Sequence, residues 1–258
     1  MKYINKGICI FCKRDSNQTS FTEKAHTMPK SLGSESIGVD ICNECNHYFG
    51  EPDLLSTPNL CIEVCVKEIF GLTKHLLECE KGLENKKLKS RYFEFWKSKN
   101  KIVIKNAYKC NFIFQKTFVN QFKRGLYEMF LQEFHKETGK GLEHRFDAIR
   151  NFARYNEGNI PLYHLQDNGV ILTEQTFPPP QFRFTDKQFQ NIDTYGFYTL
   201  ILYGKWFFME VTPQAIICRE EYLKKAEEII GSGFSFNRLV EVSSIQDIDF
   251  LLQKLYGG

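Results

Sequence analysis

Two cysteine pairs frame residues 9–50, which read CIFCKRDSNQTSFTEKAHTMPKSLGSESIGVDICNECNHYFG. Two residues separate Cys9 from Cys12, and two separate Cys42 from Cys45. Because this spacing turns both sulfurs of a pair toward one point, two such pairs provide the four thiolates of a tetrahedral zinc site. The 29 residues between the pairs exceed the usual ~15–20, so we expect a small structural unit between them. The alternative is that the four thiols only pack in a core.

Length and composition indicate a folded soluble protein. The 258 residues are 42% hydrophobic and 25% charged, which excludes a disordered, collagenous or low-complexity chain. The first residues lack a secretory apolar run, and no stretch approaches ~18 uncharged apolar residues. We therefore expect a cytoplasmic protein without membrane contact, in which cysteines stay reduced. The five cysteines outside the pairs are expected to be core thiols: Cys61, Cys65, Cys79, Cys110 and Cys218.

Positive charge is concentrated in residues 81–109. These hold ten Lys or Arg against two Glu, a local charge of +8. The overall charge is +3, so the rest of the chain carries a charge of −5. Aromatic residues between the basic ones suggest a surface that follows phosphates and stacks on bases. The predicted nucleic-acid-binding residues are Lys86, Lys87, Lys89 and Arg91. The alternative is an amphipathic helix with a solvated basic face and its aromatic residues in the core.

Residue patterns predict short strands at 21–28 and 37–42 followed by a helix, and then longer helices. Ser56 and Pro58 resemble an N-cap and first-turn proline. Further helices are predicted at 56–80, 118–137, 145–155, 219–230 and 245–256. Strands of an antiparallel sheet are predicted at 161–164, 170–174, 182–185, 196–202 and 206–211, with a hairpin turn at Tyr203-Gly204-Lys205. We divide the chain into residues 1–55, a helical and basic connection at 56–110, and an α+β region at 111–258.

The segment between the cysteine pairs contains His26-x-x-Pro29-x-x-x-Gly33, and Asn46 follows the last cysteine directly. Together with the cysteine pairs, this pattern resembles the zinc-stapled subgroup of the HNH endonuclease family over residues 7–52. The resemblance implies a ββα-metal unit. With the elements predicted above, the fold class is α+β: an N-terminal zinc-stapled ββα-metal (HNH) unit, central helices, and a C-terminal antiparallel sheet with flanking helices.

The resemblance implies a metal-dependent endonuclease that hydrolyses phosphodiester bonds in DNA. His26 would be the general base, since an imidazole titrates near neutral pH. Besides structural Zn²⁺, one catalytic divalent ion, most often Mg²⁺, would be bound through Asn46, or through His47 if the helix starts one residue later. Ala25 stands where relatives have an acidic residue, and residues 33–40 lack the family's middle Asn. Asp40 and Glu23 are the candidates for the missing carboxylate.

The sequence also leads to expectations about binding partners and about alternative functions. DNA is the expected partner, and the C-terminal region is a candidate site for a protein partner or for homo-oligomer formation. Similarity to prokaryotic HNH proteins of comparable length suggests a role in restriction or antiphage defence. The departures at Ala25 and at the middle Asn favour a second interpretation, a zinc-stapled nucleic-acid-binding module without cleavage. An interaction scaffold that does not bind DNA is the third.

Overall fold

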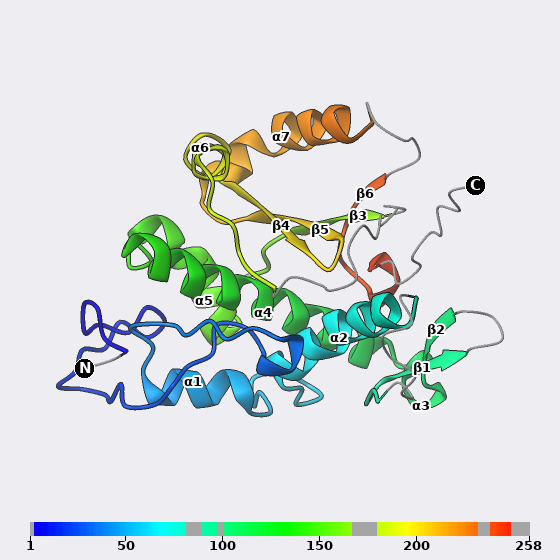
Figure 1. The fold of residues 1–258 in the computed structure, drawn as a ribbon, viewed down its shortest axis with the longest axis horizontal. Helices are drawn as coiled ribbons and strands as arrows, with labels where there is room; N and C mark the ends of the chain where they lie inside the picture. Colours follow the sequence, from blue (N-terminus) through cyan, green and yellow to red (C-terminus); the bar gives the residue numbers. More distant parts are fainter. Residues whose placement is uncertain (1–2, 81–88, 97–100, 167–179, 232–237, 249–258) are drawn as a thin grey trace.

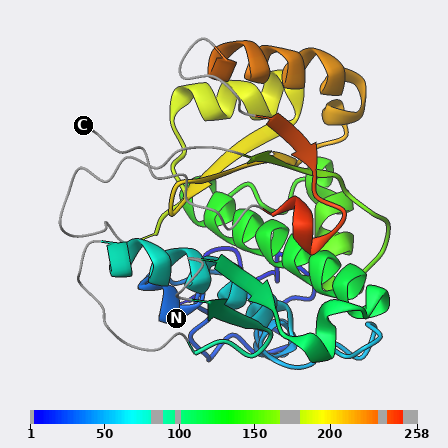
Figure 2. The same cartoon turned by 90° about the vertical axis from the view of Figure 1, so that its right-hand side faces the viewer.

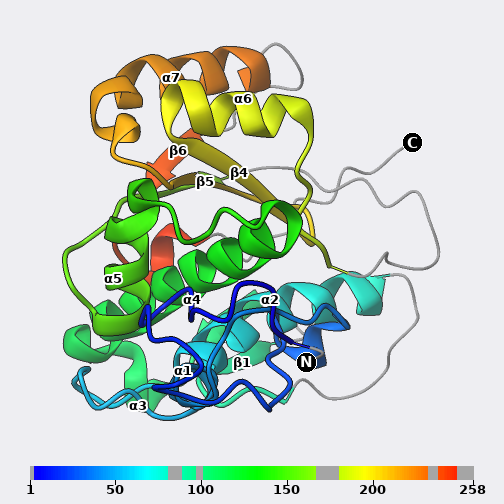
Figure 3. The same cartoon turned by 90° about the vertical axis from the view of Figure 1, so that its left-hand side faces the viewer.

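The computed structural model describes residues 3–80, 89–96, 101–166, 180–231 and 238–248. The fold is α+β, with two antiparallel sheets among the described residues. A four-stranded sheet lies between helices α6 and α7 on one side and the long helix α4 on the other (Figures 1 and 3). The elements of the N-terminal half are η1 (Lys30–Leu32), α1 (Asn43–Gly50), α2 (Ile62–Glu80), β1 (Phe93–Trp96), β2 (Lys101–Ile104) and α3 (Asn106–Lys109).

The C-terminal half contains the larger sheet, in the order β4-β5-β3-β6 with antiparallel neighbours. Its elements are α4 (Phe112–Thr138), η3 (His144–Phe146), α5 (Asp147–Tyr155), β3 (Leu162–Gln166), α6 (Asp186–Tyr195), β4 (Phe197–Leu202), β5 (Lys205–Glu210), α7 (Gln214–Gly231), β6 (Arg238–Glu241) and η4 (Ile245–Asp247). Leu202 pairs with Lys205, and both intervening residues have positive φ, as a two-residue hairpin turn requires. The predicted turn at Tyr203-Gly204-Lys205 is thereby confirmed.

The two N-terminal strands are much shorter than predicted. Only one isolated bridge, His26 to Ile37, joins residues 21–28 to 37–42. Asp40 has a φ of 57°, so the chain turns away beyond the bridge. Its backbone N–H donates to Tyr3 O at 2.9 Å, and its carbonyl accepts from Ile10 N at 2.9 Å. Beyond Gly38, whose N–H donates to Ala25 O at 2.9 Å, the second predicted strand therefore pairs its backbone with the N-terminal loop and not with the first strand.

Helix α2 begins later than the sequence suggests. Ser56 is not its N-cap, because the Ser56 hydroxyl accepts from Leu60 N at 3.1 Å and donates to Asp53 O at 2.9 Å within the preceding loop. The predicted end near Glu80 is confirmed. Helices α2 and α4 approach closely at Gly125, where any Cβ would collide with the side chain of Val66. The glycine therefore sets the distance between the two helices.

Other predicted elements differ in extent. Residues 182–185 form no strand, while helix α6 and strand β6 were not predicted. The predicted strand 170–174 and most of the predicted helix 245–256 lie outside the described residues. Helix α4 ends at Gly139 with a φ of 69°, as predicted from the glycine.

In the described part of the basic segment, residues 93–96 and 101–104 pair as the antiparallel hairpin of β1 and β2, so the alternative of an amphipathic helix is wrong there. Tyr92 and Phe93 pack on Phe114 and Phe118 of helix α4, whereas Trp96 is 45% exposed. The hairpin lies on the side of α4 opposite the four-stranded sheet (Figures 1 and 2).

One apolar core extends from Cys9 to Ile248 and includes side chains from all three predicted regions. The predicted boundaries after residues 55 and 110 fall in connections between elements, and the division itself stays a prediction. Across the described part of the chain, no helix combines the length and the apolar character needed to cross a membrane.

Candidate metal centre

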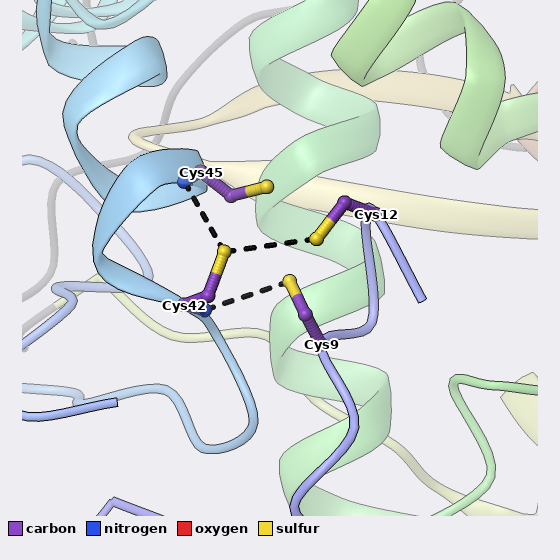
Figure 4. A group of neighbouring side chains, drawn as sticks. All are labelled: Cys9, Cys12, Cys42 and Cys45. Atoms are coloured by element: carbon purple, nitrogen blue, oxygen red, sulfur yellow. Dashed lines mark hydrogen bonds between the residues drawn. The ribbon is translucent and has the colours of Figure 1, made fainter. Parts of the chain in front are cut away.

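The four paired cysteines converge at the start of helix α1 (Figure 4). Their sulfur atoms all lie within 4.8 Å of one another, and Cys12 Sγ is 3.7 Å from Cys42 Sγ. Sulfurs at the corners of a zinc tetrahedron lie about 3.8 Å apart, so the donor set fits Zn²⁺. Within the described residues, this is the one place where three or more His, Cys, Asp or Glu ligand atoms converge in this way. The cluster therefore indicates a zinc site.

Backbone geometry brings the second pair into position. Cys42 is the N-cap of α1, and its sulfur accepts from Cys45 N at 3.4 Å. Hydrogen bonds from Cys45 and Cys9 lower the pKa of Cys42 to about 3, and those from the same two thiols also lower the pKa of Cys12. The pKa values of Cys9 and Cys45 are raised, because their thiols serve as donors to Cys12 and Cys42. Binding of Zn²⁺ would therefore release protons, which makes it pH-dependent.

Three arginines surround the sulfurs. Arg14 Nε donates to Cys12 Sγ at 3.3 Å, and Arg150 is buried with its Nε bonded to Ile10 O. Burial would lower the pKa of Arg154, but its interactions with Cys45, Tyr48 and Tyr155 together raise it. A Zn²⁺ held by four thiolates carries a net charge of −2, which these guanidinium groups offset.

The other cysteines differ among themselves. Burial raises the pKa of Cys61 and of Cys65, in agreement with core thiols. Cys110 is exposed and Cys218 is half-buried, so the prediction of core thiols is wrong for these two. The side chain of Cys79 lies outside the described residues.

His26 lies at the bridge to Ile37 and is half-buried. Its Nδ1 is buried without a hydrogen-bond partner among the described residues. Burial is the main cause that lowers the pKa of His26, and the charges of Lys24 and Lys30 lower it further, while Glu63 acts in the opposite direction. The imidazole is therefore neutral near pH 7, the state that accepts a proton.

Asn46 and His47 lie on α1, just after the cysteine pair. Asn46 is half-buried, and its backbone N–H donates to Cys42 O at 2.9 Å. His47 Nε2 lies 2.5 Å from Glu23 Oε2, and both side chains are partly exposed. Two residues predicted as alternative metal ligands thus bind each other.

Asp40 has a structural role in place of the predicted metal-ligand role. It is fully buried, and its carboxylate accepts from the backbone N–H groups of Asn5, Lys6 and Gly7 at 2.7–2.9 Å. His135 Nε2 lies 3.0 Å from its Oδ2. Burial would raise the pKa of Asp40, but the contact with His135 and the three backbone bonds lower it. With these four contacts, the carboxylate fastens the N-terminal loop to helix α4.

A comparison with known protein families finds a match in the region that contains the cysteine cluster and His26. Residues 9–52 match the family model described as HNH endonuclease. This HNH segment includes the four cysteines, His26 and Asn46, and it ends before helix α2. No curated protein and no solved structure matches the chain.

A buried polar network joins the HNH segment to the rest of the protein, and the sequence did not suggest it. Arg124 of α4 bonds to Asp53, which follows the segment directly, and its Nη2 donates to Tyr48 OH on α1. The same guanidinium donates to Ala153 O at 3.0–3.1 Å. Arg154 stacks over the Tyr48 ring at 3.8 Å. Helix α1 is therefore positioned by the C-terminal half of the chain.

Of the predicted nucleic-acid-binding residues, Lys89 and Arg91 lie just before β1 and are exposed. Arg91 N donates to Glu68 Oε1 at 2.7 Å, which anchors this part of the segment to α2. Lys86 and Lys87 lie outside the described residues.

Proposed function

We propose that the protein is a metal-dependent HNH endonuclease that hydrolyses phosphodiester bonds in DNA. One observation carries the proposal: the histidine of the HNH pattern, His26, is neutral and has a buried nitrogen without a partner. The histidine lies in the segment that the cysteine cluster fixes. A role in restriction or antiphage defence belongs to the same proposal and stays a prediction.

In this mechanism, His26 accepts the proton of a water molecule that attacks the scissile phosphorus. Lys24 and Lys30 are exposed and close enough to lower the pKa of His26, so they attract the phosphate toward it. The Asn46 side chain offers one amide oxygen to a divalent ion. When bound, such an ion would neutralise charge on the phosphoryl oxygens.

The direct test is nicking of supercoiled plasmid by zinc-loaded protein in Mg²⁺ or Mn²⁺. We expect His26→Ala to lower the nicking rate by about 10²–10⁴-fold, the usual contribution of a general base. His144→Ala is the matched control, because the His144 side chain is 94% exposed. Equal nicking by wild type and His26→Ala would refute the catalytic role of His26.

The second candidate function is a zinc-stapled DNA-binding module without cleavage. Ala25 favours it, since a methyl group stands where the family has an acidic residue. Retained DNA binding without nicking by the wild type would support this module. Absence of DNA binding at low salt would support an interaction scaffold.

DNA binding is proposed to involve the basic segment of residues 81–109, which includes strands β1 and β2. The hairpin and α1 lie on the same side of α4, away from the four-stranded sheet, so one DNA duplex can contact both (Figure 1). We expect the triple substitution of Lys86, Lys87 and Lys89 by Ala to weaken DNA binding. The slope of the logarithm of the binding constant against the logarithm of the salt concentration should become shallower by up to about three. Fluorescence anisotropy at several salt concentrations measures both quantities.

The control for this prediction removes three lysines from the other side of the protein. Lys187, Lys224 and Lys225 are exposed on α6 and α7, beyond the sheet. Their replacement by Ala changes the net charge equally and should leave the salt dependence nearly unchanged. If both triple variants lose affinity equally, the effect is one of net charge, and Lys86, Lys87 and Lys89 are not DNA contacts.

A further inference from the structure

One acidic side chain from outside the HNH segment lies against the end of helix α1. Glu63 is in the first turn of α2, and its Oε2 lies 3.5 Å from the position that a Cβ on Gly50 would occupy. Gly50 is the last residue of α1, four residues after Asn46. Because residues four apart lie on the same helix face, Glu63 reaches the face of α1 that carries Asn46.

Glu63 also acts on the catalytic histidine. Its charge raises the pKa of His26, against the effects of burial and of Lys24 and Lys30, so the carboxylate lies within electrostatic reach of the imidazole. The Glu63 side chain is 35% exposed, and its Oε1 pairs with Lys67 Nζ at 2.8 Å. Its Oε2 is the oxygen that lies against Gly50. A ligand from solvent can therefore reach this carboxylate.

The carboxylates of Asp40 and Glu23 are engaged, and Glu128 is neutral. Asp40 is bonded to three backbone N–H groups and His135, and Glu23 is bonded to His47. Glu128 of α4 is buried and accepts from Gln132, and burial raises its pKa well above the usual range, with Glu63 adding to the shift. Glu63 thus presents a partly exposed carboxylate to the Asn46 face of α1, within electrostatic reach of His26.

We infer that Glu63 supplies the carboxylate that binds the divalent ion beside His26, in place of the acidic residue missing at Ala25. Mg²⁺ and Mn²⁺ prefer carboxylate oxygen, and Mg²⁺ sites commonly use one or two carboxylates together with water and substrate phosphates. Glu63 and the amide oxygen of Asn46 match that requirement. The carboxylate lies in ordinary van der Waals contact with the Cβ position of Gly50, at 3.5 Å, which places it beside the end of α1. The inference rests on the proposed nuclease site and assigns it a ligand from α2.

The test uses Mn²⁺ binding to the zinc-loaded full chain, followed by the electron paramagnetic resonance signal of free Mn²⁺. We expect Glu63→Gln to weaken Mn²⁺ binding at least about tenfold, and Glu63→Asp to restore part of it. Lys67→Gln breaks the same ion pair but keeps the carboxylate, so it should bind Mn²⁺ like the wild type. Glu51→Gln removes an exposed carboxylate beside Gly50 and should also have no effect.

Three results would overturn the inference: wild-type affinity in Glu63→Gln, an equal loss in Lys67→Gln, or no Mn²⁺ binding by the wild type. Circular dichroism of each variant verifies that the fold is retained. The plasmid assay separates this inference from the proposed function. Glu63-dependent Mn²⁺ binding without nicking would refute only the nuclease function, whereas His26-dependent nicking with normal Mn²⁺ binding by Glu63→Gln would refute only the role of Glu63.

Discussion

Removal of zinc should unfold the HNH segment, and Cys42→Ser should have the same effect. Structural zinc sites contribute about 10–16 kcal/mol to the folding of small domains at neutral pH. Within the segment itself, a single bridge joins the two extended stretches, so the cysteine cluster is the main link between its two ends. Cys42 contributes twice, as a ligand and as the N-cap of α1. Hydrogen exchange before and after chelation should show loss of protection in residues 9–50.

Two measurements accompany this prediction. Elemental analysis of freshly purified protein should find about one zinc per chain, as four-coordinate cysteine sites hold one ion. Cys110→Ser is the matched control, because Cys110 is exposed and far from the cluster in sequence. It should keep the zinc and the exchange protection. Protein without zinc, or protection that survives chelation, would contradict the assignment of the site.

Replacement of Arg124 by Met should destabilise the whole protein by about 3–5 kcal/mol, because it leaves the Asp53 charge buried without its partner. Both side chains are fully buried, and Arg124 also donates to Tyr48 OH, Phe152 O and Ala153 O. Urea denaturation followed by circular dichroism measures the loss. The double variant Arg124→Met with Asp53→Leu should lose less than the sum of the single variants, since it removes both charges.

The effect of Arg124 should depend on pH. Burial would raise the pKa of Asp53, but hydrogen bonds from Gln121 and Leu55 N and the charge of Arg124 lower it overall. A carboxylate with a lowered pKa stabilises the folded state above its unfolded pKa of about 4 and loses that contribution as the pH falls further. The difference between wild type and Arg124→Met should therefore shrink below about pH 4. A constant difference from pH 7 to pH 3 would show that the ion pair contributes little.

Local patterns in the sequence predicted the parts that depend on local chemistry. The paired cysteines predicted their own cluster, and apolar spacing predicted α2 and α4. Helix α6 was missed because it buries only Ile192 and so lacks a strong apolar stripe. The prediction of the second N-terminal strand was wrong for a different reason, since the backbone of Asp40 pairs with a loop that lies 30 or more residues earlier in the chain. Local propensity carries no information about such a partner.

The candidate site was predictable to the same extent. His26 and Asn46 follow from the motif, but the environment of Asp40 depends on α4, and that of Glu63 depends on how α2 packs against α1. Asp40 and Glu63 look alike in sequence, since each is an acidic residue beside apolar ones. Only the packing shows that the first fastens a loop and that the second lies against the end of α1.

The contacts of Tyr48 with two arginines affect how the HNH segment can be used. Arg124 comes from α4 and Arg154 from α5, and the next residue of α1, Phe49, is buried in the common core. A fragment that stops at residue 55 would leave both rings in water. We therefore expect that the HNH segment cannot be transferred to another protein by itself, because its fold requires the contacts with α4 and α5.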